Sequence, residues 1–124
     1  MSTARILICD DEEGVRESLK LIFEGRYEVT SADNGEEAVA HLAQASYDLL
    51  CLDLKMPRMD GMDTLRRVRQ LAPSLPVLIL TAYHSVDIAK EAIRLGAKDY
   101  ISKPFDKDQL LEAVERLLAR HNVT

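Results

Sequence analysis

Five short apolar runs alternate along the chain with segments whose apolar residues recur every three or four positions. The apolar runs predict strands, and they cover residues 5–9, 27–30, 49–52, 77–80 and 100–101. A run as apolar as 49–52 is typical of a strand that is covered on both faces of a parallel sheet. The run at 27–30 is more polar, which predicts a strand nearer the edge.

The segments between the strands have the spacing of amphipathic helices. Their apolar stripes are Val15, Leu19, Ile22 and Phe23; Ala38, Val39 and Leu42; Met62, Leu65, Val68 and Leu71; Val86, Ala89 and Ile93; and Leu110, Leu111, Val114, Leu117 and Leu118. Asp33 or Asn34 can cap the second helix, and Gly96 is expected just past the end of the fourth. Five strand–helix units with short connections predict an α/β fold, a doubly wound five-stranded parallel sheet with five helices on both faces.

Composition and charge limit the number of domains and the kinds of partner that the chain can have. The chain has 124 residues, and no shift in composition marks a second unit, so residues 1–124 are expected to form a single domain. A net charge of −5 argues against nucleic acid as a direct partner. The most basic segment, with Arg66, Arg67 and Arg69, is interpreted as the solvated face of a helix. No apolar run approaches the roughly 20 residues of a membrane span, and the N-terminus lacks a signal peptide's apolar region, which together predict a cytoplasmic location.

The two cysteines, Cys9 and Cys51, both lie inside apolar runs. We therefore expect buried free thiols in a reducing compartment. A disulfide would be conceivable only if the two strands that carry them were neighbours.

Polar side chains follow the predicted strands at the points where the strands end. Asp10 and Asp11 follow the first strand, Asp53 the third, Thr81 the fourth, and Lys103 the fifth. Ligands of open parallel sheets bind at the carboxyl ends of the strands. We therefore expect three carboxylates, a hydroxyl and an ammonium to meet at one edge of the sheet.

The clustered acids need a cation, although none of them would need one alone. Taken alone, Asp10 and Asp11 would be acids at a helix N-terminus, and Lys103 a surface ammonium. Two like charges about 4 Å apart repel by roughly 4 kcal/mol at an effective dielectric near 20, so three carboxylates together need a cation. Oxygen-only ligands favour Mg²⁺, with Mn²⁺ or Ca²⁺ as substitutes. The cluster thus predicts a cationic site for phosphoryl oxygens, beside a carboxylate that can attack phosphorus.

Five separated motifs resemble the receiver domain of bacterial two-component response regulators. They are Asp10-Asp11, Asp53 at the end of a strand, the segment LKMPRMDGM that begins at Leu54, Thr81-Ala82, and Lys103-Pro104-Phe105. Their order and strand placement agree with that family over essentially the whole chain. Residues 53–65 and 96–105 are most similar to receivers of the nitrogen-regulation transcriptional activator class. The resemblance implies a flavodoxin-like sheet with strand order 2-1-3-4-5.

The resemblance also implies the chemistry of the acidic residues. Asp53 is the expected phosphoacceptor. Asp11 and Asp53 are expected to bind Mg²⁺ directly, with Mn²⁺ as a substitute, and Asp10 mostly through water. The main-chain carbonyl of Lys55 completes the implied set of protein ligands.

Other residues are expected to bind the phosphoryl group and pass on the signal. Thr81 and Lys103 are implied contacts of the phosphoryl oxygens, and a cis bond before Pro104 would aim Lys103 inward. Phosphorylation would draw Thr81 toward the new charge, and Tyr100 would fill the space that opens. The fourth helix, fifth strand and fifth helix are the expected output face.

Three further positions qualify this expectation. Lys55 and Tyr83 occupy positions that tune the lifetime of the phosphoryl group in the family. Ala113 stands where winged-helix-class receivers have an arginine that pairs across a dimer, which argues against that dimer. A different phosphorylation-dependent homodimer remains compatible with the sequence.

The resemblance implies partners as well. The phosphoryl group would come from a sensor histidine kinase or a histidine phosphotransfer protein, and a small phosphodonor could also serve. The output domain would be an ATPase module with a DNA-binding module, as in transcriptional activators of this class. The chain would be a self-modifying phosphorylation switch and not an enzyme that turns over a separate substrate.

Three other functions fit the residues of this chain less well. An Mg²⁺-dependent phosphohydrolase with an aspartate nucleophile generally has a second aspartate two residues later, where this chain has Lys55, and it needs a cap domain. A flavodoxin-type cofactor module needs a loop after the first strand that accepts phosphate, whereas the four acids of residues 10–13 would repel one. The third is a receiver that works without phosphorylation, and the complete acidic set argues against it.

Overall fold

Ten alternating elements make up the computed structural model, which describes residues 3–56 and 59–121 except the side chain of His121. Pro57 and Arg58 of the LKMPRMDGM motif therefore lie outside the described residues. The strands are β1 (Arg5–Cys9), β2 (Glu28–Ala32), β3 (Leu49–Leu52), β4 (Val77–Thr81) and β5 (Asp99–Ser102). The helices are α1 (Glu13–Phe23), α2 (Gly35–Gln44), α3 (Gly61–Leu71), α4 (Val86–Arg94) and α5 (Lys107–His121).

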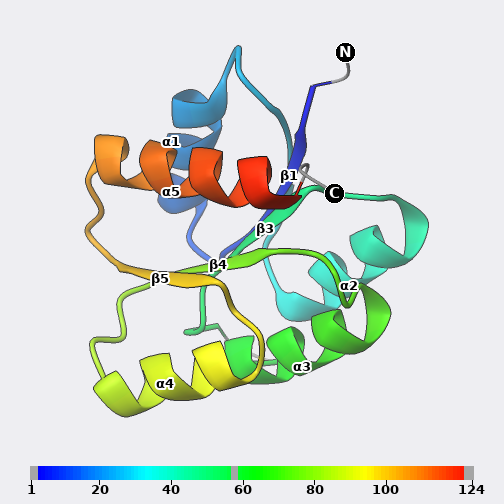
Figure 1. The fold of residues 1–124 in the computed structure, drawn as a ribbon, viewed down its shortest axis with the longest axis vertical. Helices are drawn as coiled ribbons and strands as arrows, with labels where there is room; N and C mark the ends of the chain where they lie inside the picture. The colour runs from blue at the N-terminus through cyan, green and yellow to red at the C-terminus, as the bar shows by residue number, and fades with distance from the viewer. Residues whose placement is uncertain (1–2, 57–58, 122–124) are drawn as a thin grey trace.

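All five strands run parallel in one sheet with the order β2-β1-β3-β4-β5. Helices α1 and α5 cover one face of the sheet, and α2, α3 and α4 cover the other (Figure 1). The chain order of the strands reverses at β1, which lies between β2 and β3. These observations confirm the predicted α/β class and the flavodoxin-like strand order. Open parallel sheets bind ligands at the carboxyl ends of the strands beside such a reversal, which here are those of β1 and β3.

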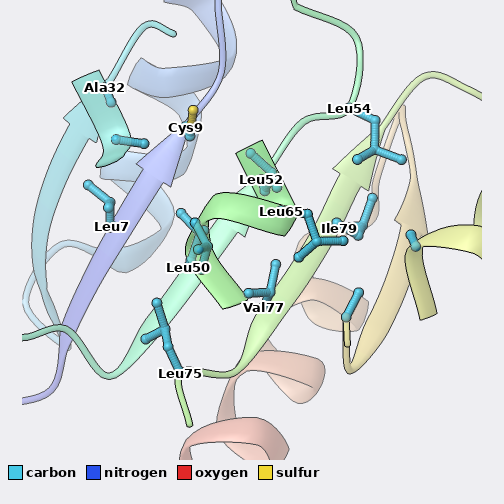
Figure 2. Close-up of a cluster of buried hydrophobic side chains, with 14 of the residues drawn as sticks. Leu7, Cys9, Ala32, Leu50, Leu52, Leu54, Leu65, Leu75, Val77 and Ile79 are labelled. Atoms are coloured by element: carbon cyan, nitrogen blue, oxygen red, sulfur yellow. The ribbon is translucent and has the colours of Figure 1, made fainter. Parts of the chain in front are cut away.

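Side chains that alternate along the central strands build two cores, one on each face. Leu7 of β1 belongs to the core under α2, α3 and α4, whereas its neighbours Ile6 and Ile8 belong to the core under α1 and α5. Figure 2 shows Leu65 of α3 packed over the side chains of β3 and β4, including Leu50. Full burial of each such leucine contributes about 1.5–3 kcal/mol. The central strands are mostly apolar because both of their faces are covered, with Arg5 and Thr81 as polar residues at their ends.

The edge strands are longer than their apolar residues predicted. β2 begins at Glu28 and pairs with β1 as far as Ala32, beyond the predicted 27–30. Its middle residues are only half-buried, so polar residues are tolerated there, and the apolar pattern ends before the hydrogen bonding does. The position of β2 at the edge of the sheet confirms the prediction made from its polarity.

The helix boundaries follow local signals. The Asn34 side chain, and not that of Asp33, caps α2 by accepting from the Glu37 N–H at 2.8 Å. Gly96 follows Leu95, the C-cap residue of α4, with a φ of 107°, a left-handed conformation that favours glycine, as predicted just past the end of the helix.

One surface prediction was wrong. Arg66 and Arg67 are exposed, but Arg69 is half-buried, and its guanidinium donates to the main-chain oxygens of Pro73 and Leu75. The side chain also packs under Gly96, where an added Cβ would lie 2.7 Å from the Arg69 Cδ. Arg69 therefore satisfies carbonyl groups after the end of α3 instead of facing solvent.

The cysteines are buried free thiols, as predicted. Their strands β1 and β3 are neighbours, but the register pairs Ile8 with Cys51 and Cys9 with Leu52. Cys9 and Cys51 therefore point to opposite faces of the sheet and belong to different cores, which excludes a disulfide in this fold. No helix within the described part of the chain is both long and apolar enough to span a membrane.

Candidate functional site: an acidic pocket at the carboxyl edge of the sheet

The main chain fixes where the two innermost acids leave the sheet. The Asp53 N–H donates to the Cys9 carbonyl at 3.0 Å, and the Asp10 N–H donates to the Ala32 carbonyl at 3.1 Å. Asp10 and Asp53 thus continue the pairing of β1 with its neighbours by one residue. Their side chains leave the sheet next to each other, at the point where the strand order reverses.

Four carboxylates gather at this point. One oxygen from each of Asp10, Asp11, Glu12 and Asp53 lies within 4.8 Å of the others. Asp10 and Asp53 are buried, at 2% and 3% exposed, whereas Asp11 and Glu12 are exposed. The structure thus brings together the three predicted acids and adds Glu12, which was read only as one of four acids in the loop.

Lys103 reaches the acids from the end of β5. Its Nζ lies 2.8 Å from Asp10 Oδ2, 3.2 Å from Asp53 Oδ2 and 3.4 Å from Glu12 Oε1. The Lys103 N–H donates to the Thr81 carbonyl at 2.8 Å, and the peptide bond between Lys103 and Pro104 is cis, as the resemblance implied. With its side chain only 10% exposed, the ammonium is an integral part of the pocket.

Burial and pairing shift the ionisation of this cluster. Burial raises the pKa of Asp10, although hydrogen bonds from Lys103 and from the Glu12 N–H oppose that rise. Burial alone would lower the pKa of Lys103, but the hydrogen bond to Asp10 and the charges of Asp10 and Asp53 outweigh it, and the pKa of Lys103 is raised. Lys103 is therefore a permanent ammonium at neutral pH.

The donor set suits a hard divalent cation. Three of the four carboxylates contact the Lys103 ammonium, and together the four carry a formal excess of three negative charges over it within a few ångströms. Carboxylate oxygens are the donors that Mg²⁺ and Mn²⁺ prefer, and the four members of the cluster supply oxygen only. Asp53 Oδ1 accepts from the Lys55 N–H at 3.0 Å, which orients the carboxylate before any ion binds. The residues thus fit the implied metal.

The loop after Asp53 depends on a close approach at Gly61. A Cβ at this position would lie 2.2 Å from the Leu54 Cα and 2.7 Å from the Asp53 carbonyl oxygen. The Gly61 N–H donates to the Leu54 carbonyl at 3.1 Å, and Asp60 caps α3 by accepting from the Asp63 N–H. The start of α3 therefore fits against the site only because residue 61 has no side chain.

Thr81 and two tyrosines form a connected group beside the acids. Thr81 is fully buried, and its Oγ1 accepts from the Tyr83 N–H at 3.4 Å. The Tyr100 hydroxyl donates to the Tyr83 carbonyl at 2.8 Å. Burial, and secondly the charge of Asp53, raises the pKa of Tyr100. The predicted switch residues are therefore linked to each other through the main chain of Tyr83.

An open groove leads from the acidic pocket between α1 and the loop after β5. It has a volume of about 700 Å³, and its lining includes Glu12, Gly14, Val15, Lys103, Phe105 and Lys107. Glu12 and Lys103 belong both to the groove and to the acidic pocket. The groove therefore borders the acidic pocket at these two residues.

A doubly wound sheet with acids and a lysine at its switch point defines the class of phosphoryl-transfer receivers. The family model for the response regulator receiver domain matches residues 6–115, so the chain belongs to that family. The receiver family is a family of phosphorylation switches, and this chain is one of its phosphoacceptor domains.

Individual relatives agree with this assignment. The chain is 39% identical over 120 residues to the transcriptional regulatory protein ZraR of Salmonella typhimurium, covering 96% of this chain and 27% of that protein. A CheY-like receiver domain protein from Methanospirillum hungatei JF-1 superposes with a TM-score of 0.92 at 34% identity, covering 97% of both chains. NtrX from Brucella abortus gives a TM-score of 0.92 at 31% identity, covering 98% of this chain and 28% of that one.

The relatives also bear on the subclass. ZraR and NtrX support the closer resemblance to receivers of the nitrogen-regulation class. The chain spans about a quarter of the length of each of these two relatives.

Proposed function

We propose that this receiver takes a phosphoryl group on Asp53. The observation that carries the proposal is the setting of the Asp53 carboxylate. It is buried, lies 3.2 Å from the Lys103 ammonium, and has oxygens of three other carboxylates within 4.8 Å. A carboxylate in this setting has both a reason to hold a cation and a neighbouring positive charge for phosphoryl oxygens.

The acids would hold Mg²⁺, and Mn²⁺ would substitute for it. Asp11 and Asp53 would be direct ligands, Asp10 would act through water, and the carbonyl of Lys55 would complete the protein donors. The exposure of Asp11 suits a direct ligand at the solvent side, and Asp10 makes the shorter contact with Lys103, at 2.8 Å against 3.2 Å for Asp53. When bound, the ion supplies positive charge for the phosphoryl oxygens and neutralises the excess of carboxylates.

The residues of the chain supply the remaining parts of the transfer. An oxygen of Asp53 attacks the phosphorus of a phosphohistidine while the bond from phosphorus to the imidazole nitrogen breaks, and the imidazole leaves. Lys103 stabilises charge on the phosphoryl oxygens, and Thr81 donates its hydroxyl to one of them. The chain has little proton transfer to perform because phosphoryl transfer asks chiefly for positioning and charge stabilisation.

The new charge would act through Thr81 and Tyr100. A phosphoryl group adds about −1.5 to −2 charges, which favours a hydrogen bond from Thr81 to a phosphoryl oxygen over the 3.4 Å contact with the Tyr83 N–H. Movement of Thr81 would disturb the Tyr83 main chain, to which the Tyr100 hydroxyl is bonded. The populations of the α4–β5–α5 face would shift as a result.

Lys55 and Tyr83 would tune how long the phosphoryl group lasts. Lys55 is exposed next to the site, and Tyr83 is 37% exposed beside Thr81. Both side chains are therefore free to shield the acylphosphate from water. Phosphate-release rates of Lys55→Ala and Tyr83→Ala that equal the wild-type rate would contradict this role.

Partners and output follow from the family. A sensor histidine kinase or a histidine phosphotransfer protein in the cytoplasm would donate the group, and residues 1–124 would form one domain that controls an ATPase and a DNA-binding module. The chain would modify only itself, without turnover on a separate substrate.

The arrangement of an arginine-paired winged-helix dimer is not proposed, because Ala113 is buried and has no charge. A phosphohydrolase is disfavoured because the exposed Lys55 stands where its acid–base aspartate belongs.

The proposal is tested by incubating the protein with acetyl phosphate and Mg²⁺ and measuring its intact mass. We expect the addition of one phosphoryl group that is stable to acid and labile to base, and no addition when the metal is chelated. Beryllofluoride should bind to the wild-type site and not to Asp53→Ala. A mass that stays unchanged under all these conditions would overturn the proposal.

A further inference from the structure

Glu12 has the extended backbone of an N-cap residue, but its side chain does not cap the helix. It is the N-cap residue of α1, with φ −94° and ψ 117°, yet its side chain makes no capping hydrogen bond. N-cap side chains that accept from the first turn usually stabilise a helix by about 1 kcal/mol. Instead, Glu12 Oε1 lies 3.4 Å from the Lys103 Nζ. The carboxylate is thus directed toward the site ammonium and not toward its own helix.

The surroundings place this carboxylate at the entrance of the site. The Asp53 side chain is 3% exposed and that of Lys103 is 10% exposed, whereas the Glu12 side chain is 63% exposed. Glu12 also lines the groove between α1 and the loop after β5. One of its oxygens lies within 4.8 Å of an Asp53 oxygen. A phosphoryl group arriving at Asp53 would therefore come close to this negative charge.

We propose that Glu12 is a specificity-determining residue that disfavours highly anionic phosphodonors at the entrance of the Asp53 site. The inference rests on the proposed phosphorylation of Asp53. Its basis is that a fixed charge within a few ångströms is weakly screened, since the Debye length is about 8 Å at physiological salt. Glu12 also competes with phosphoryl oxygens for the Lys103 ammonium. The repulsion grows with the net negative charge of the donor, whereas the competition for Lys103 is similar for donors with the same phosphoryl group.

Two small phosphodonors separate this effect from a general loss of function. In acetyl phosphate the Asp53 oxygen attacks phosphorus, the bond to the acetate oxygen breaks, and acetate leaves. In phosphoramidate the bond from phosphorus to nitrogen breaks, and ammonia leaves with the protons that it already carries. Acetyl phosphate reacts as a dianion, whereas phosphoramidate has one negative charge fewer in its zwitterionic form.

The test compares Glu12→Gln with Glu13→Gln at Mg²⁺ concentrations that saturate each protein. Glu13 is an exposed acid in the first turn of α1 and is not a member of the carboxylate cluster, so its substitution makes the same change in net charge. We expect Glu12→Gln to raise the ratio of the acetyl phosphate rate to the phosphoramidate rate about threefold, as one unit of charge acting over several ångströms in a hydrated setting would do. The increase should shrink as salt is added, and Glu13→Gln should leave the ratio near the wild-type value.

Each other outcome has a distinct meaning. Equal changes of both rates in Glu12→Gln would overturn the inference, because they would show that Glu12 acts through the metal or through Lys103 alone. An equal ratio change in Glu13→Gln would overturn it as well, since bulk charge would then be sufficient. A wild-type protein that neither donor modifies would overturn the proposed function itself, and the inference with it.

Discussion

The charged residues at the amino ends of the strands (the amino edge) and at their carboxyl ends (the carboxyl edge) are arranged in opposite ways. At the amino edge, the Arg5 N–H donates to Asp48 Oδ2 at 2.8 Å, and its guanidinium donates to the Ser46 carbonyl at 2.9 Å. The guanidinium carbon also lies 4.8 Å from the centre of the Tyr47 ring. At the carboxyl edge, four carboxylates lie together, and the Lys103 ammonium contacts three of them.

The difference separates structural charges from functional ones. The charged groups of Arg5 and Asp48 each have a hydrogen-bond partner within the protein, so that edge does not need a ligand. The carboxyl edge has an excess of three negative charges close to two buried carboxylates, which costs stability until a cation arrives. A local imbalance of charge at the switch point of the sheet is therefore the feature that marks the site.

The largest expected effect comes from substitution of one acid at each edge. Asp53→Asn should reduce phosphorylation by acetyl phosphate by a factor on the order of a thousand or more, because the nucleophile is lost. Asp48→Asn should retain the wild-type rate, since Asp48 belongs to the paired edge. Rates measured by intact mass spectrometry check both expectations. Phosphorylation of Asp53→Asn at the wild-type rate would contradict the assignment of function to the carboxyl edge.

The second effect concerns the positive residue at each edge. Lys103→Met should lower the free energy of unfolding by about 3 kcal/mol in the presence of a chelator, because it leaves the buried carboxylates without their counter-charge. Arg5→Met should cost about 1 kcal/mol through the lost hydrogen bond and ring contact. Urea denaturation with chelator and with Mg²⁺ measures both values. Mg²⁺ should narrow the difference in unfolding free energy between the wild type and Lys103→Met, but not the difference between the wild type and Arg5→Met. Equal narrowing of both differences would contradict the account.

A third effect separates metal binding from overall charge. Mg²⁺ at 100 times its dissociation constant should raise the free energy of unfolding by about 2.7 kcal/mol. Asp11→Asn should weaken Mg²⁺ binding about tenfold, whereas Glu13→Gln outside the cluster should not. Thermal denaturation as a function of Mg²⁺ concentration gives the affinity of each protein. Equal affinities for the wild type and Asp11→Asn would exclude Asp11 as a ligand.

The smallest expected effect involves the two thiols and is seen only at alkaline pH. Burial raises the pKa of Cys51 from 9.0 to about 12, and burial followed by the charges of Asp10 and Asp53 raises the pKa of Cys9. The unfolded chain loses these protons above about pH 9 while the folded protein keeps them, so stability should fall as the pH rises from about 9 toward 12.

The slope of that fall tests the assignment to each thiol. One buried thiol contributes up to about 1.4 kcal/mol per pH unit between its unfolded and folded pKa values. Cys51→Ala should therefore reduce the slope of the unfolding free energy against pH in this range, whatever its effect on stability at neutral pH. Urea denaturation at several pH values measures the slope. An unchanged slope in Cys51→Ala would contradict the shifted pKa.

The sequence predicted the parts of the fold that depend on apolar pattern and topology. The bounds of β1 and β3 were predicted correctly because the apolar run of a central strand extends nearly over its whole length, with Arg5 of β1 as the exception. The meeting of Asp10 with Asp53 was predictable because the residues that follow parallel strands share one edge. β2 extends to Ala32 unpredicted, since half-buried edge residues do not have to be apolar.

Side-chain direction was not predictable in the same way. Four acids in residues 10–13 do not show which of them turns inward, so Glu12 was missed as a member of the pocket. The helical pattern placed Arg69 beside Arg66 and Arg67 on a charged face. Only the three-dimensional arrangement shows Arg69 bound to carbonyls after α3 and packed under Gly96.

The most direct measurement of the central claim is the location of the phosphoryl group. The protein is treated with acetyl phosphate and Mg²⁺, the acylphosphate is reduced with borohydride to homoserine, and the modified residue is found by peptide mass spectrometry. The account predicts homoserine at Asp53 alone and none when the metal is chelated. Homoserine at Asp10 or Asp11 instead, or modification that persists without a divalent ion, would contradict it.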